Sequence, residues 1–262
     1  MKLFPNDVKW YGRFLDNNKI RYFDYSASGF EFCFTGTKAS CTILSNPEDW
    51  ENHTRGIVGV FIKELNSPNE YVSSCFWDNF SNSEPNRISL DKNINECVLF
   101  SSETPKTVVI QVIKISECAF AYAGLKEINI EGSPVLENPS IKSNKNPLKL
   151  EIIGDSITCG YGIDGIFEKD SFTTQQQRPD KAYGFLTAKS LNADFHFVSW
   201  SGIGLISNYV DETVNVPDTH YLMPPNWPYT DKSLCLRLGI DCEVWDESKF
   251  SPDIVVIHLG TN

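Results

Sequence analysis

Basic residues are scarce in this sequence, and those present are scattered. Its 262 residues include 23 lysines and arginines against 34 aspartates and glutamates, which gives a net charge of −11. A partner with a phosphate backbone requires clustered basic side chains, and no such stripe is present. We therefore do not expect the chain to bind nucleic acid. An acidic surface suits a protein whose ligand is neutral or small.

Long apolar segments are also missing. No apolar run approaches the roughly 20 residues that cross a bilayer, so we expect no membrane partner. The start, MKLFPNDVKWYGRF, lacks the apolar core of a signal peptide. These features predict a cytoplasmic location. Secretion after removal of a signal segment remains the alternative.

Metal-binding patterns are absent from the cysteines and histidines. The chain has eight cysteines and four histidines, but it has neither a Cys-x-x-Cys pair nor a grouping with zinc-ligand spacing. A chain of this length can bury a core without disulfides. We expect reduced, mostly buried thiols rather than a disulfide framework, and neither a metal nor an organic cofactor.

The first half of the chain contains a series of short segments typical of β-strands. GFEFCFTG (29–36) places three phenylalanines on one face, and LKEINIEG (125–132) alternates in the same way. Residues 56–65 and 107–116 are β-branched runs, turn-forming stretches separate the segments, and no convincing helix precedes residue 150. This pattern predicts a β-sandwich over 1–135.

The amino-acid composition and the hydrophobic pattern change in the second half of the chain. Prolines, asparagines and serines are frequent in the stretch up to residue 147, which predicts a linker over 136–147. Beyond it, apolar runs at 148–154, 195–202 and 253–260 are typical of buried strands, and 181–194 has helical spacing weakened by Gly184. Strand, helix, strand and a longer excursion to another strand predict a parallel α/β domain over 148–262.

The three predicted parallel strands end in similar signatures: Gly154-Asp155-Ser156, Ser201-Gly202 and Gly260-Thr261-Asn262. Parallel neighbours bring these ends to one edge of the sheet, where ligands bind. A serine hydroxyl can attack an ester carbonyl there. The N–H groups of Ser156 and Gly202 and the side-chain amide of Asn262 can stabilise the resulting oxyanion.

The first signature also has a purely structural interpretation. Gly-Asp-Ser alone is common turn chemistry, in which Asp and Ser cap the following helix. The sequence, however, has three strand ends with matching signatures, and this context favours a catalytic site over a simple capping turn.

Three sequence blocks carry a family resemblance. GDSITCGYG, VSWSGIG and PDIVVIHLGTN resemble blocks one, two and three of the SGNH (GDSL-type) hydrolases, which are serine esterases without the Gly-x-Ser-x-Gly elbow. With VKWYGRF, SGFEFCFTG and the long β-rich half, the chain is most similar to carbohydrate esterase family two, the family of acetylxylan esterases. The resemblance implies an N-terminal jelly-roll domain, a C-terminal SGNH α/β domain, and removal of acetyl groups from polysaccharides such as acetylated xylan.

The resemblance also assigns roles to residues. It implies that Ser156 is the nucleophile, that Gly202 and Asn262 are oxyanion partners, and that Asp155 holds the turn. The general-base histidine of the family comes from a block after the Gly-Thr-Asn strand. The sequence printed here ends at Asn262. The resemblance therefore implies an α/β domain incomplete at its C-terminus, and a chain that is nearly inactive by itself because serine needs a base.

The four histidines offer no obvious substitute for that base. His53 falls in a loop of the first half, His196 opens the second strand, and His258 is expected to pack within the third. His220 is on a loop that could approach the site, but nothing in its spacing recommends it.

Aromatic residues are frequent in and around the excursion over 203–251. Trp200, Trp227 and Tyr229 could form platforms for the apolar faces of sugars, although each ring considered singly is more typical of loop packing. We therefore predict a serine esterase that deacetylates an acetylated oligosaccharide or polysaccharide. The alternatives are a carbohydrate-binding protein with an inactive hydrolase domain, and an SGNH esterase acting on acyl lipids. The lack of an exposed apolar stripe near the motif argues against the lipid esterase.

Overall fold

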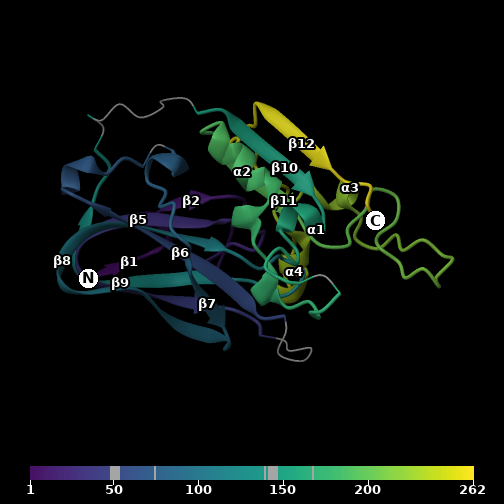
Figure 1. The fold of residues 1–262 in the computed structure, drawn as a ribbon, viewed down its shortest axis with the longest axis horizontal. Coiled ribbons are helices and arrows are strands. Elements are labelled where there is room, and N and C mark those ends of the chain that lie inside the picture. The colour runs from purple at the N-terminus through teal and green to yellow at the C-terminus, as the bar shows by residue number, and fades with distance from the viewer. Residues whose placement is uncertain (48–53, 74, 139, 141–146, 167) are drawn as a thin grey trace.

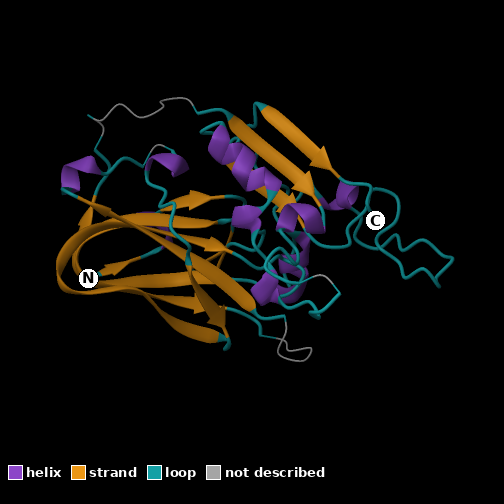
Figure 2. Cartoon of the chain, viewed as in Figure 1, coloured by secondary structure: helices purple, strands orange, loops and turns teal. Residues whose placement is uncertain are grey.

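The computed structural model describes residues 1–47, 54–73, 75–138, 140, 147–166 and 168–262, and it contains two β-sheets (Figures 1 and 2). The first sheet lies entirely within the first half of the chain. Its nine strands are β1 (Lys2–Leu3), β2 (Lys9–Tyr11), β3 (Leu15–Asn17), β4 (Ile20–Tyr22), β5 (Gly29–Leu44), β6 (Gly56–Leu65), β7 (Asn86–Leu90), β8 (Ile94–Lys114) and β9 (Gly124–Val135).

The first sheet is antiparallel, with the order β3-β4-β9-β5-β8-β6-β7, while β1 pairs with β9 and β2 with β5. It curls strongly, because the long strands β5 and β8 bend back (Figure 1). Strand β5 runs eight residues past the predicted end at Gly36, to Leu44. The pairing register shifts between Gly36 and Lys38, which is the irregularity that lets one long strand bend.

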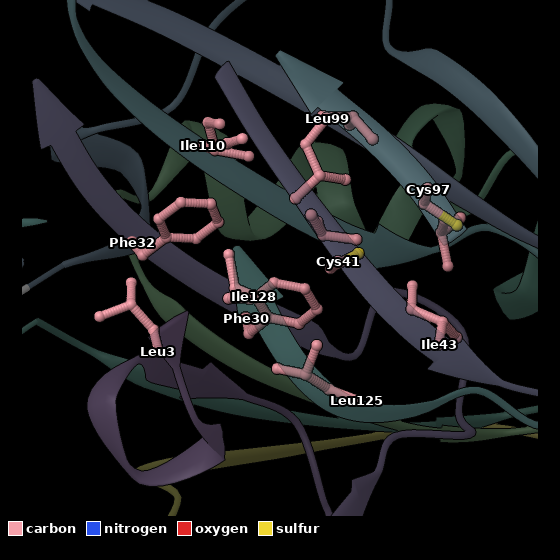
Figure 3. Packing of buried hydrophobic residues seen from close by; sticks show 14 of the residues in the cluster. Leu3, Phe30, Phe32, Cys41, Ile43, Cys97, Leu99, Ile110, Leu125 and Ile128 are labelled. Carbon is pink, nitrogen blue, oxygen red and sulfur yellow. The ribbon is translucent and has the colours of Figure 1, made fainter. Parts of the chain in front are cut away.

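An apolar core fills the inside of the curl (Figure 3). Phe30, Phe32 and Phe34 are all buried there, as predicted, but the strand is buried on both faces rather than half-buried. The opposite face of the same strand is also covered. Glu31 is fully buried and accepts hydrogen bonds from Tyr11 Oη (2.5 Å), Gln111 Nε2 (2.5 Å) and Asn79 Nδ2 (2.8 Å).

The second sheet is parallel, as the sequence predicted, and its strand order is β11-β10-β12. Its strands are β10 (Lys149–Gly154), β11 (Asp194–Ser199) and β12 (Ile254–His258). The α-helices are α1 (Ser156–Cys159), α2 (Tyr183–Ser190), α3 (Met223–Asn226) and α4 (Lys232–Leu238). The 3₁₀ turns are η1 (Pro5–Asp7), η2 (Pro68–Glu70), η3 (Phe76–Asp78), η4 (Thr174–Gln176) and η5 (Pro179–Lys181).

Helix α2 is shorter than the predicted 181–194, because a 3₁₀ turn at Pro179–Lys181 precedes it and β11 already begins at Asp194. Gly184 belongs to the helix: a Cβ there would lie 3.0 Å from the Phe197 ring. The glycine therefore lets α2 pack closely on the sheet. No α-helix occurs among the described residues before 150, in agreement with the prediction.

An apolar cluster joins the two halves of the chain. It combines Ile57, Phe76 and Ile113 of the first half with Ile152 and Phe185 of the second. Such a shared core fixes the second sheet against the first. The predicted linker over 136–147 falls largely on residues outside the described ranges.

A buried ion pair crosses the same boundary. Arg13 Nη2 lies 2.9 Å from Glu151 Oε1 in β10, and both side chains are almost fully buried. Arg13 also donates to the Tyr229 carbonyl oxygen at 2.6 Å. These contacts fasten the N-terminal segment to the second sheet.

All eight cysteines are free thiols, and seven of them are buried, as predicted. Within the described ranges, no helix is both long enough and apolar enough to cross a membrane.

Candidate active site

The first predicted strand end forms a tight turn from β10 into α1. Asp155 is the N-cap of α1, and its Oδ1 accepts a hydrogen bond from the Ile157 N–H at 3.0 Å. Ser156 is the first residue of the helix and is half-buried. A Cβ on Gly154 would lie 1.9 Å from Thr158 Oγ1, so only glycine allows the helix to return this closely. The turn presents the Ser156 hydroxyl at the carboxyl end of β10.

The second strand end follows β11. Gly202 has φ +80°, a left-handed conformation that favours glycine. Its carbonyl accepts a hydrogen bond from the Tyr209 N–H at 2.8 Å, while no described group accepts one from the Gly202 N–H. That N–H is therefore available to a ligand.

The third strand end reaches both of the others. Asn262 Nδ2 donates to the Ile203 carbonyl at 3.0 Å and lies 3.4 Å from Asp155 Oδ2. The arrowheads of β10 and β12 point to the same side of the molecule, where the C-terminus lies (Figure 1). Ser156, Gly202 and Asn262 thus come from three strand ends that lie together at one edge of the parallel sheet.

A carboxylate from the first half also reaches this edge. Glu117, which follows β8, accepts hydrogen bonds from both the N–H and the hydroxyl of Ser201. Burial raises the pKa of Glu117, and the hydrogen bonds from Ser201 and Gln177 oppose that rise. Sequence reasoning missed this residue. The only available signal was a single acid in the small, apolar stretch ISECAFAYAG, which is too weak to locate its partner 84 residues away.

None of the three described histidines hydrogen-bonds Ser156, and His53 lies outside the described residues. His196 is buried with its ring stacked on Phe250 at 3.6 Å. His258 is exposed rather than packed within the sheet, as are most residues of β12, and its ring centroid lies 5.2 Å from that of Tyr183. His220 is exposed, and its Nδ1 lies 3.0 Å from Asp218 Oδ1.

A cavity of about 440 Å³ opens beside the second strand end. Trp200, Ser201, Gly202 and His220 are among the residues that line it. Of the three aromatic residues named from the sequence, only Trp200 belongs to this lining.

The other two aromatic residues have contacts within the protein. Trp227 Nε1 donates to Glu151 Oε2 at 3.1 Å. The Tyr229 ring lies 3.9 Å from Lys232 Nζ. Both side chains therefore contribute to packing where the structure places them. Among the described residues, no group of three or more His, Cys, Asp or Glu side chains is arranged to hold a metal ion.

The sequence is similar to those of known carbohydrate-active esterases. The chain is 41% identical over 114 residues to the cellulase/esterase CelE of Acetivibrio thermocellus, a match that covers 44% of this chain and 12% of that protein. It is 29% identical over 185 residues to an acetylxylan esterase / glucomannan deacetylase of Cellvibrio japonicus, covering 69% of this chain and 46% of that protein. No family profile matches the chain.

The fold agrees as well. The structure of a family two carbohydrate esterase from Clostridium thermocellum in complex with cellohexaose superposes with a TM-score of 0.71 at 26% identity, covering 97% of this chain and 66% of that one. The chain is a relative of the family two carbohydrate esterases. It matches less than half the length of either curated relative, 12% and 46%. The superposition covers 97% of this chain, and so includes both its curled antiparallel sheet and its parallel one.

Proposed function

We propose that this protein is a serine esterase that removes acetyl groups from carbohydrate. The observation that carries the proposal is the meeting of Ser156, Gly202 and Asn262 at the carboxyl edge of one parallel sheet. A hydroxyl, a free backbone N–H and a side-chain amide are the groups needed to attack an ester and stabilise the oxyanion. The named activities of the relatives, acetylxylan esterase and glucomannan deacetylase, support this substrate class.

The reaction has two steps. Ser156 Oγ attacks the acetyl carbonyl carbon while its proton passes to a general base. The Gly202 N–H and the Asn262 amide stabilise the oxyanion. The bond between the acetyl carbon and the sugar oxygen breaks, the sugar leaves with a proton, and an acetyl-Ser156 ester remains. Water then attacks this ester, releases acetate and restores the serine hydroxyl.

The general base is the part of the proposal that the described histidines do not supply. The family resemblance implies a histidine that follows the Gly-Thr-Asn strand. The alternative function, carbohydrate binding without turnover, predicts that oligosaccharides bind while acetate is not released.

Acetate release from acetylated xylan and acetylated glucomannan tests the proposal, with calorimetric titration of xylo- and cello-oligosaccharides alongside. Activity is measured here and below in a full-length form of the protein that supplies the general base. In that form we expect release that Ser156→Ala abolishes while oligosaccharide binding and thermal unfolding stay the same. Asp211→Asn, on an exposed loop, is a matched control that should leave release unchanged. Binding without any release would favour the binding protein, and release that survives Ser156→Ala would contradict the esterase mechanism.

We also propose that 1–135 forms a jelly-roll-like β-sandwich domain and 148–262 an SGNH-type α/β domain. The confinement of each sheet to one of these ranges supports the division.

We further propose a cytoplasmic location. The eight free thiols support it, because thiols persist in a reducing compartment. Cell fractionation with an antibody to the protein tests the location.

A further inference from the structure

A fully buried carboxylate from the first half of the chain contacts the proposed site. Glu117 Oε1 accepts from the Ser201 hydroxyl at 2.5 Å and from Gln177 Nε2 at 2.5 Å, and Oε2 accepts from the Ser201 N–H. The Glu117 N–H in turn donates to Gln177 Oε1 at 3.0 Å. A carboxylate with several donors around it is the well-satisfied form of a buried acid.

The contact with Ser201 fixes the backbone next to the proposed oxyanion donor. Glu117 binds Ser201 at two points, the backbone N–H and the side-chain hydroxyl, so Ser201 cannot rotate without losing both bonds. The peptide unit that follows carries the Gly202 N–H. Gly202 itself has φ +80°, a conformation in which glycine is free to move unless its neighbours hold it.

The same carboxylate also touches the helix that begins with Ser156. Cys159, the last residue of α1, is buried with its Sγ 3.8 Å from Glu117 Oε2 and 3.4 Å from Ser199 Oγ. Glu117 therefore lies between the segment that carries the proposed nucleophile and the segment that carries the proposed donor. Among the described residues, no other acidic side chain contacts both of these segments.

We propose that Glu117 is a positioning residue, which sets the direction of the Gly202 N–H relative to Ser156. This inference rests on the proposed function of the site. An oxyanion donor contributes most when its direction is fixed before the reaction. Loosening the Ser201–Gly202 peptide therefore lowers the rate of the chemical step more than it weakens substrate binding.

The test compares Glu117→Gln with Glu31→Gln in the same protein. Glu31 is a matched control, since it is also fully buried and also accepts hydrogen bonds from hydroxyl and side-chain amide groups, but its partners all belong to the first half of the chain and not to the strand ends. We expect Glu117→Gln to lower kcat for 4-nitrophenyl acetate by about 10–100-fold with KM changed little. Glu31→Gln should lower thermal stability and leave kcat unchanged.

Ser201→Ala provides a second variant, which leaves the buried Glu117 carboxylate unchanged. It removes the Ser201 hydroxyl and keeps the backbone N–H. We expect it to reduce kcat less than Glu117→Gln does. Amide hydrogen exchange provides a readout that does not need activity: the Ser201 and Gly202 amides should exchange faster in Glu117→Gln, while those of β11 stay protected.

The outcomes separate this inference from the function on which it rests. If Ser156→Ala abolishes turnover while Glu117→Gln changes neither kcat nor the exchange of these two amides, the positioning role is wrong and the esterase remains. If Glu117→Gln and Glu31→Gln lower kcat equally, the effect is general destabilisation and the inference is also wrong. If turnover does not depend on Ser156, the proposed function fails, and unchanged exchange in Glu117→Gln would then overturn the inference separately.

Discussion

The Asn262 side-chain amide donates to the Ile203 carbonyl at 3.0 Å and so ties the segment after β12 to the loop after β11. Its second contact, to Asp155 Oδ2, is longer at 3.4 Å. The longer contact is the weaker hydrogen bond, so one N–H can turn to an oxyanion while the other keeps the side chain in place. Asn262 is therefore anchored by side-chain contacts to the segments that follow β10 and β11.

This geometry predicts the effect of removing the amide. Asn262→Ala should lower kcat for acetate release by about 10²–10³, the usual loss for one oxyanion donor, with little change in KM. Steady-state kinetics on 4-nitrophenyl acetate measure the effect, and Asn215→Ala, at an exposed loop position, is the control. Unchanged turnover in Asn262→Ala would leave the hydrogen bonds standing but remove the catalytic role.

The buried pair of Arg13 and Glu151 predicts a stability effect. Arg13→Met strands the Glu151 carboxylate in the interior, and breaking a buried pair in this way costs about 3–5 kcal/mol of unfolding free energy. Urea denaturation measures the loss.

The double variant Arg13→Met/Glu151→Leu distinguishes a stranded charge from lost packing. It should recover part of the loss, because no charge is then left unpaired. A double variant as unstable as Arg13→Met would show that the Arg13 contacts to the Trp227 and Tyr229 carbonyls matter more than the ion pair.

His196 predicts a dependence of stability on pH. Burial, with smaller contributions from Arg13 and Lys149, lowers its pKa to about 3. Below about pH 6.5 the His196 imidazole binds a proton in the unfolded chain but stays neutral in the folded protein. This group therefore lowers the free energy of unfolding progressively from pH 6.5 down to 3. His196→Phe should gain about 2 kcal/mol relative to the unsubstituted protein at about pH 5 compared with pH 7.

Urea denaturation at the two pH values checks this. Phenylalanine can keep the stacking on Phe250, so the comparison between pH values cancels any packing change. An equal difference between the two proteins at both pH values would show that His196 does not titrate in this way.

Strand β12 predicts self-association. It is an edge of the second sheet, and its Ile254, Val255 and Ile257 side chains are 45%, 46% and 63% exposed. Unpaired edges and exposed apolar faces promote association. We expect light scattering to show dimers or larger species of the 262-residue chain at micromolar concentration, and Ile257→Lys to shift them towards monomer. A monomeric unsubstituted chain would contradict this.

Local pattern was enough to predict the second sheet. Three apolar runs bounded by Gly and polar residues became the parallel strands β10, β11 and β12, because parallel strands carry an apolar signal along their whole length. The prediction that all three are buried is confirmed for β10 and β11 and wrong for β12, whose residues are mostly exposed. The ends of β5 and β8 were not predictable in this way. Their continuation past Gly36 and before Thr107 depends on pairing with partners far along the chain, which a local pattern does not contain.

The residues of the candidate site also differ in how far local sequence could predict them. Ser156, Gly202 and Asn262 were found because each follows a recognisable strand. Glu117 was not, because its role depends on Ser201, which reaches it only through the packing of the two halves. Trp227 was named for its aromatic ring, whereas its indole N–H is engaged by Glu151, a contact between residues that are 76 apart in sequence.

The central claim, that Ser156 attacks the ester, is tested most directly by trapping the covalent intermediate. The protein is mixed with 4-nitrophenyl acetate, quenched in acid within the first turnovers and digested, and the peptide that contains Ser156 is analysed by mass spectrometry. We predict that this peptide gains one acetyl group, located on Ser156, and that the Ser156→Ala protein gains none there. Acetate release from a protein that never carries an acetyl group on Ser156, or carries it on another residue, would contradict the account.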